Sequence, residues 1–175
     1  MTPEQGRFLL EFYLPLLAED SKATRKVLAA VPDDQRGYRP DPKARTAAEL
    51  AWHIATVDVW FLDGIANGNF PMEEPTDPGE RTGAEMAAWY EENLARGIER
   101  VKALSDEELV RPVSFFNVET HPAVFYMSYL MHHSIHHRGQ LAAYLRPMGA
   151  TCPSIYGGSA DEPFDPAAHG MEAAG

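Results

Sequence analysis

Residues 131–149, MHHSIHHRGQLAAYLRPMG, hold four of the chain's seven histidines within six positions. A random six-residue window of this 175-residue chain would hold about 0.24 of a histidine, so chance does not explain the cluster. Leucine and tyrosine recur through the stretch at helical spacing, and Pro147 and Gly149 follow it. We therefore predict a helix from near Pro122 to about Arg146 that carries paired histidines.

The histidines form two pairs with the spacing of one helical turn, His132/His136 and His133/His137. Side chains four residues apart lie on one helix face with Cβ atoms roughly 6 Å apart, and two imidazoles so placed can bind one divalent metal ion. The second pair shares its face with leucines and a tyrosine, so we expect it to face the core. The first pair shares a smaller and more polar face, which indicates a surface or supporting position.

Three earlier stretches begin with a Thr-x-x-Glu or Thr-x-x-Gln sequence, the capping box that marks the start of a helix. The first predicted helix runs to Pro32 and contains Pro15, which should kink or split it. The second should end at Gly68, since glycine accepts left-handed backbone angles. A further capping sequence after the third helix predicts one short extra turn. The four capping sequences begin at Thr2, Thr46, Thr82 and Ser105.

The remaining segments are connections. Residues 70–78 contain three prolines and three acids and should form an exposed loop. Residues 111–120 are rich in Val and Phe, and we expect a locally extended linker that is too short for a sheet. Residues 151–175 are broken by Pro and Gly. The sequence thus predicts an all-α four-helix bundle over residues 1–150, followed by an irregular tail over 151–175 that packs partly on the bundle and frays over its last dozen or so residues.

Composition narrows the class of protein. The chain is 45% apolar and 23% charged, which fits one globular domain. Its single cysteine, Cys152, excludes an intramolecular disulfide and a Cys-rich zinc module. The absence of a long apolar run and of a secretory signal favours a cytoplasmic protein that does not enter membranes. The net charge of −11 disfavours binding to nucleic acid.

A third metal ligand is expected from the second helix. His53 lies between Leu50 and Val57 on the apolar stripe, where a buried imidazole is costly unless its nitrogens are satisfied. Catalytic metal sites keep a coordination position open, whereas structural zinc sites usually have four protein ligands. We therefore predict a metal centre made by His53, His133 and His137, and we favour chemistry over a scaffolding role.

Three stretches resemble the DinB-like superfamily, the DinB- and YfiT-type metal-binding four-helix bundles. ELAWHIATVDVWF (49–61) is similar to the second helix of that superfamily. HHSIHHRGQLAAYLRPMG (132–149) is similar to its fourth-helix signature, in which a His precedes His-Arg-Gly-Gln by four residues. CPSIYGGSADE (152–162) resembles a segment often found after that helix. The resemblance spans about residues 8–162.

The resemblance implies several properties of the chain. The metal ligands of the superfamily fall on His53, His133 and His137, the residues that the helix faces also favour. The metal would be zinc, nickel or manganese, and the protein would commonly be a homodimer, for which exposed apolar faces on the first two helices are candidates. The wider superfamily includes S-transferases and a maleylpyruvate isomerase that use low-molecular-weight thiols.

Two reactions suit such a metal centre. A metal ion can hold a small thiol as the nucleophilic thiolate, or can lower the pKa of bound water and so support hydrolysis. A hydrolase would want a carboxylate base. Neither nearby acid is a clear candidate for this base. The capping box already accounts for the presence of Glu49. Asp58 lies about 140° round the helix from His53, so the two side chains should not share a face. We favour a thiol-dependent S-transferase acting on a small molecule, with a hydrolase or a non-catalytic metal-binding stress-response module as alternatives.

Other residues of the fourth helix have open roles. Arg138 and Gln140 either orient ligands or close a contact between helices. Tyr126, Tyr129 and Tyr144 are expected in the core or in a pocket wall.

Overall fold

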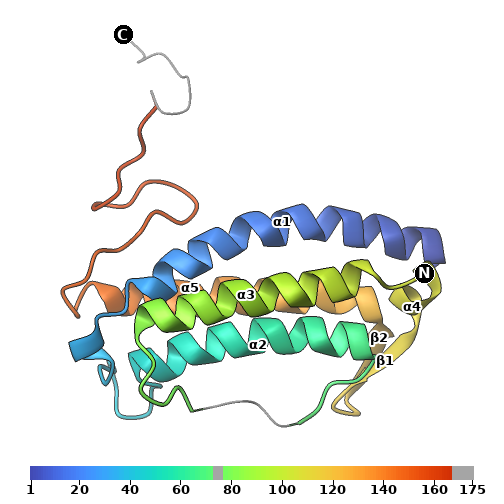
Figure 1. Cartoon of the computed structure of the whole chain (residues 1–175), viewed down its shortest axis with the longest axis horizontal. Helices are drawn as coiled ribbons and strands as arrows, with labels where there is room; N and C mark the ends of the chain where they lie inside the picture. Colours follow the sequence, from blue (N-terminus) through green and yellow to red (C-terminus); the bar gives the residue numbers. More distant parts are fainter. Residues whose placement is uncertain (73–76, 167–175) are drawn as a thin grey trace.

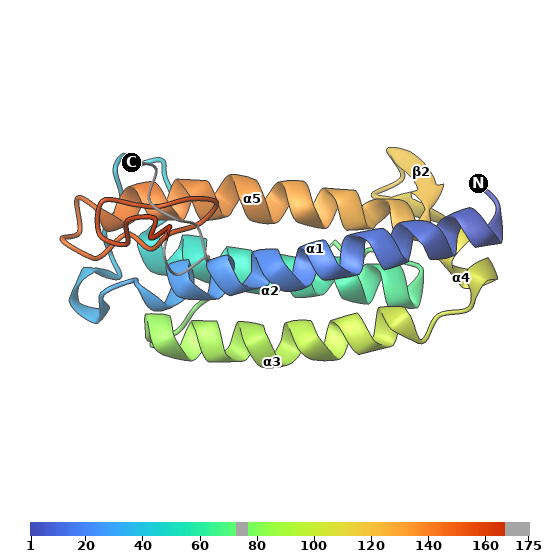
Figure 2. The same ribbon diagram turned by 90° about the horizontal axis from the view of Figure 1, so that it is seen from above.

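A computed structural model describes residues 1–72 and 77–166 of the chain. Four long helices lie side by side, and a short helix and a hairpin cover one end of them (Figures 1 and 2). The all-α fold predicted from the sequence is confirmed. The helices are α1 (Pro3–Ala29), α2 (Ala47–Asn67), α3 (Gly83–Lys102), α4 (Asp106–Val110) and α5 (Tyr126–Leu145). Two single 3₁₀ turns, η1 (Asp33–Gln35) and η2 (Ala123–Phe125), and two strands, β1 (Pro112–Phe115) and β2 (Glu119–Pro122), complete the described elements.

Capping boxes start four of the helices, as predicted. In each, the side chain of the capping residue accepts a hydrogen bond from the backbone N–H three positions on, and the Glu or Gln at that position accepts one from the N–H of the capping residue. Gly68, with φ 77°, ends α2 in the left-handed conformation. The capping residues are Thr2, Thr46, Thr82 and Ser105.

Pro15 does not split the first helix. α1 continues through it from Pro3 to Ala29 and is gently curved along its length in Figure 1. Leu10 and Leu17, on either side of the proline, are both 1% exposed. Burial of these side chains against the bundle offsets the loss of one backbone hydrogen bond, so the helix bends and does not break.

The linker before α5 forms a two-stranded hairpin, so the expectation that it is too short for a sheet was wrong. β1 and β2 pair antiparallel, with Val113 opposite His121. Three residues, 116–118, connect the strands, and Phe116 and Asn117, with φ angles of 52° and 58°, are the central residues of a turn in which the Val118 N–H donates to the Phe115 carbonyl, 3.0 Å away. Because the turn is this short, the linker has enough residues left for two short strands. Phe is a costly choice for a positive φ, and stacking of the Phe116 ring on Trp60, with centroids 5.8 Å apart, offsets part of that cost.

α2 packs against both α3 and α5. Its apolar side chains are buried or half-buried, and no large apolar side chain of α2 is exposed, so α2 offers no exposed apolar face for a dimer, contrary to the expectation for the first two helices. α1 does expose such a face, with Phe8, Phe12 and Leu16 at 67%, 53% and 44% exposure.

Within the described residues, each helix is too short or too polar to cross a lipid bilayer.

A buried ion pair joins α5 to α1 and to the tail. The Arg138 side chain is 1% exposed and donates to the Asp20 carboxylate, 3.2 Å away, and to the Thr24 hydroxyl, 3.0 Å away. Arg138 also bonds to the hydroxyl of Tyr156 in the tail. Arg138 therefore makes a contact between helices. Farther along the tail, Glu162 pairs with Lys26 of α1.

Two expectations lie partly outside the described residues. Of the predicted exposed loop 70–78, Pro71, Met72 and Asp77 are exposed, whereas Phe70 and Pro78 are buried. The loop prediction includes residues 73–76, which carry two of its acids, and the fraying prediction includes residues 167–175.

Candidate metal centre

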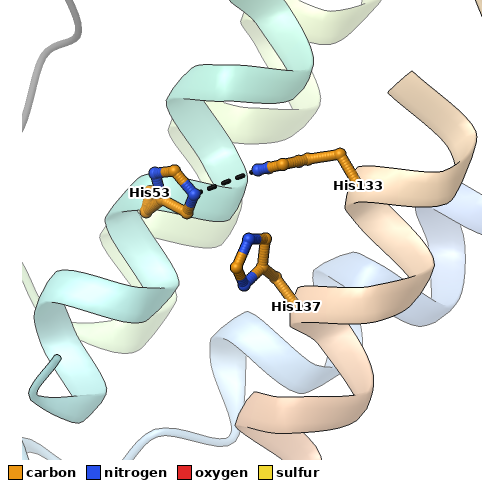
Figure 3. A group of neighbouring side chains, drawn as sticks. All are labelled: His53, His133 and His137. Atoms are coloured by element: carbon orange, nitrogen blue, oxygen red, sulfur yellow. Dashed lines mark hydrogen bonds between the residues drawn. The ribbon is translucent and has the colours of Figure 1, made fainter. Parts of the chain in front are cut away.

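Three imidazole rings meet between α2 and α5 (Figure 3). His53 comes from α2, and His133 and His137 come from α5. The ring centroids form a nearly equilateral triangle, with separations of 4.9 Å (His53 to His133), 4.7 Å (His53 to His137) and 4.6 Å (His133 to His137). One nitrogen from each ring lies within 4.8 Å of the other two. The sequence-predicted residues are thus brought together as a cluster that can hold a metal ion.

Helix geometry explains this convergence. His133 and His137 are one turn apart on α5, so their side chains project in the same direction. α2 packs directly on α5, and His53 lies on the part of α2 that faces this pair. All three residues are half-buried.

Both nitrogens of His133 have close partners. Its Nε2 lies 3.0 Å from Nε2 of His53, and its Nδ1 lies 3.2 Å from Oδ1 of Asp58. The Asp58 side chain is fully buried on α2. As expected from the helix geometry, Asp58 does not stand beside His53 as a base. Its contact with the opposite nitrogen of His133 is a feature that the sequence reasoning missed.

Gln140 holds the third ring. Its Oε1 lies 3.0 Å from Nδ1 of His137, so that nitrogen donates and Nε2 is left to bind a ligand. The Gln140 amide in turn donates to the Tyr144 hydroxyl, 3.4 Å away. Gln140 thus contacts two side chains of its own helix, His137 and Tyr144, and these contacts do not join two helices.

Burial keeps two of the rings neutral. Desolvation lowers the pKa of His53 to about 3, with further lowering by the charges of His133, Arg45 and His137. Desolvation also lowers the pKa of His137 to about 4, and the hydrogen bond to Gln140 partly opposes it. Neutral imidazole is the form that binds metals, so both rings are ready to act as ligands at neutral pH.

The donor set fits a divalent transition metal. Imidazole nitrogens bind zinc at about 2.0–2.1 Å, so two ligand nitrogens on one ion lie roughly 3.0–3.4 Å apart. The 3.0 Å between His53 and His133 already meets this requirement, and the 4.8 Å limit on the whole set leaves only small rotations for the third ring. Imidazole suits zinc and nickel, and the same set accepts manganese less strongly.

The other histidines and the tyrosines of this region are not members of the cluster, although the ring of His136 contacts that of His137, with centroids 4.7 Å apart. His132 and His136 are exposed on α5, as predicted. His121 and Tyr129 both hydrogen-bond to Glu119 of the hairpin, at 3.2 and 2.7 Å. Tyr126 donates to a backbone carbonyl in β1, and Tyr144 packs on Tyr38. These contacts join α5 to the hairpin and to the segment between η1 and α2.

Solved structures share this fold. A DinB-like protein from Bacillus cereus superimposes with a TM-score of 0.70 at 25% sequence identity, covering 83% of this chain and 97% of that one. The DinB-like protein YjoA from Bacillus subtilis superimposes with a TM-score of 0.64 at 22% identity, covering 84% of this chain and 96% of YjoA.

Sequence comparison gives the same relationship. YjoA is 29% identical over 133 residues, which cover 73% of this chain and 83% of YjoA. YrdA, also from Bacillus subtilis, is 25% identical over 156 residues, which cover 87% of this chain and 91% of YrdA. The model of the DinB family matches residues 7–166. The chain therefore belongs to the DinB family.

Proposed function

We propose that the chain is a divalent-metal-dependent enzyme that joins a low-molecular-weight thiol to an electrophilic small molecule. The observation that carries this proposal is the convergence of His53, His133 and His137 at one half-buried point between α2 and α5. Three imidazoles leave coordination positions free, which is typical of catalytic metal centres.

A divalent cation bound to the three imidazoles supplies a Lewis acid that favours the thiolate form of a small thiol at neutral pH. In the overall reaction a sulfur–carbon bond forms, and the bond between that carbon and its leaving group breaks. The leaving group departs with the electron pair, and the proton of the thiol balances its charge. His53, His133 and His137 would bind the metal ion. Asp58 contacts the ring of His133, and Gln140 contacts the ring of His137, so both would orient the metal-binding rings.

The position of the nearby carboxylates favours thiol transfer over hydrolysis. Within residues 1–72 and 77–166, the cluster of possible ligands contains no carboxylate. The two oxygens of Asp58 are engaged by His133 and by Tyr90. Glu49 is engaged in the capping box of α2. A hydrolase would need one of these groups to accept a proton from water.

Metal content and thiol reactivity test this proposal. The purified protein is loaded separately with zinc, nickel or manganese, and the His137→Ala variant is the control. We expect thiol consumption that depends on the electrophile, on the metal and on His137. We also expect the visible spectrum of the cobalt-substituted protein to change when the thiol is added. Turnover of esters or amides without thiol would indicate the hydrolase. A cobalt spectrum unchanged by every thiol, with no turnover, would indicate a non-catalytic metal-binding module.

We also propose that the chain forms a homodimer through α1. Phe8, Phe12 and Leu16 recur every four residues and form one exposed apolar face. Light scattering should give twice the mass of the chain for the natural protein and the mass of one chain for a Phe8→Ser, Phe12→Ser variant. Val118→Ser, at an 84% exposed hairpin position, is the control and should remain dimeric. A monomeric natural protein would contradict the dimer.

A further inference from the structure

Asp58 is a carboxylic acid in the core of the bundle, with no exposed side-chain surface. Its Oδ1 lies 3.2 Å from Nδ1 of His133 on α5. Its Oδ2 accepts from the hydroxyl of Tyr90 on α3, 3.2 Å away. One side chain of α2 thus joins a residue of the metal cluster to a buried tyrosine of a third helix.

A buried acid of this kind needs polar or charged partners. Within the described parts of the chain, no Lys or Arg side chain bonds to Asp58. An ionised carboxylate in the interior is costly unless an opposite charge lies near it. A divalent cation held by His53, His133 and His137 would place such a charge near Asp58, which contacts one of the three rings. The chain therefore places a buried acid where a metal ion would stabilise it.

We propose that Asp58 is a positioning residue for the metal centre: it keeps the ring proton of His133 on Nδ1, so that Nε2 is free to bind the metal, and Tyr90 holds Asp58 in place. This inference rests on metal binding by the three histidines, as proposed above. Neutral imidazole carries one proton, and the hydrogen bond made by one nitrogen decides which nitrogen remains for the metal.

Tyr90 is suited to hold the acid. It is 1% exposed, and burial followed by the charge of Asp58 raises its pKa well above the usual value. Its hydroxyl therefore stays protonated and donates to Oδ2. With one oxygen fixed by Tyr90, the other oxygen of Asp58 remains directed at His133.

A purely structural role for Asp58 makes a different prediction. If Asp58 only joined three helices, its loss would lower the free energy of unfolding and leave the tautomer of His133 unchanged. If Asp58 positions His133, its loss changes the tautomer in the metal-free protein and weakens metal binding.

The first experiment needs no metal. Two-dimensional ¹H–¹⁵N spectra of the histidine rings report which nitrogen is protonated. In the metal-free natural protein we expect His133 to carry its proton on Nδ1. In Asp58→Ala we expect a substantial population with the proton on Nε2. A natural protein protonated on Nε2, or an Asp58→Ala variant with an unchanged tautomer, would overturn the proposal.

The second experiment measures zinc affinity by competition with a chelator. Asp58→Asn keeps the size of the side chain and removes its charge, so the fold is preserved while zinc affinity falls by roughly 10- to 100-fold. Tyr90→Phe removes one hydroxyl and should lower the affinity by a smaller factor. Asp63→Asn is the matched control on α2, because Asp63 is exposed and pairs with Arg100 of α3. Asp63→Asn should bind zinc like the natural protein.

The two experiments separate the inference from the proposed function. If the natural protein binds zinc and Asp58→Asn binds it equally well, the positioning role is wrong and the metal centre stands. If the natural protein binds no zinc, nickel or manganese, the metal centre is wrong, and the ring spectra still decide whether Asp58 sets the tautomer of His133. Should Asp58→Ala fail to fold, Tyr90→Phe supplies the same spectral comparison.

Discussion

The Nε2 atoms of His53 and His133 lie 3.0 Å apart, although 80 positions separate the two residues in the chain. With the ring proton on Nδ1 beside Asp58, as proposed above, Nε2 of His133 is the acceptor in the contact with His53. The two rings therefore already face each other at the separation that a shared metal ion requires. The first prediction follows from this placement.

Among the four histidines of α5, only the two in the cluster should matter for metal binding. His133→Ala and His137→Ala should each weaken binding by more than about 100-fold, beyond the loss typical of an outer hydrogen-bonding partner. His132→Ala and His136→Ala remove exposed rings from the same helix and serve as controls. Metal retained after dialysis is the measurement. Equal retention by all four variants would refute the ligand assignment.

Gln140 should contribute to the affinity through His137. Gln140→Leu removes the acceptor of the Nδ1–H group and lets the ring of His137 rotate or exchange its proton. We expect zinc affinity to fall by roughly 10-fold, measured by competition with a chelator. Gln35→Leu, at an exposed position in η1, controls for the change of residue type. If both variants bind zinc equally well, Gln140 does not orient the ring.

The buried ion pair between Arg138 and Asp20 should dominate the stability of the contact between α1 and α5. Arg138→Met leaves the Asp20 carboxylate, whose side chain is 12% exposed, without its charged partner. Such losses cost about 3–5 kcal/mol of unfolding free energy. Thermal unfolding should therefore shift downward by roughly 6–20 °C. Arg96→Met on the surface of α3 should change the midpoint little. Similar midpoints for the two variants would show that the pair stabilises the fold no more than a surface charge does.

The capping boxes should make the fold sensitive to acid. Hydrogen bonds from the backbone and side chains of the capping residues lower the pKa values of Glu49, Glu85 and Glu108. A carboxylate with a lowered pKa in the folded state stabilises the fold above its unfolded pKa, near 4.3, and that contribution is lost as the pH falls through the folded value.

Substitution of these three residues by Gln tests the acid sensitivity. The unfolding temperature of the triple variant should fall less steeply than that of the natural protein below about pH 4.5. Glu11→Gln, at an exposed position outside the capping boxes, should keep the natural slope. Parallel curves for the triple variant and the natural protein between pH 6 and 3 would contradict this.

The helices and their first residues could be predicted because their signals are local. A capping residue and its Glu or Gln lie three positions apart, and a helix face is set by a spacing of three or four residues. The same local rule separated His133 and His137 from His132 and His136 without knowledge of any other helix. The spacing around His53 then indicated which side of α2 it occupies.

The missed features depend on contacts between distant segments. Asp58 and His53 project from different sides of α2. They nevertheless contact the same ring, because Asp58 lies beside Nδ1 of His133 and His53 lies beside its Nε2. No spacing within α2 reveals that contact. The pairing of Arg138 with Asp20, 118 positions away, is equally invisible to local patterns. The hairpin was missed because Phe116 occupies a turn position that glycine or asparagine usually fills.

X-ray absorption by the cobalt-loaded protein, with an anomalous difference map of its crystals, tests the metal centre most directly. We predict one cobalt ion bound by three imidazole nitrogens, located between α2 and α5 at His53, His133 and His137. A metal ion bound by other residues, or these three rings bonded only to protein groups in a protein that takes up no metal, would contradict the account.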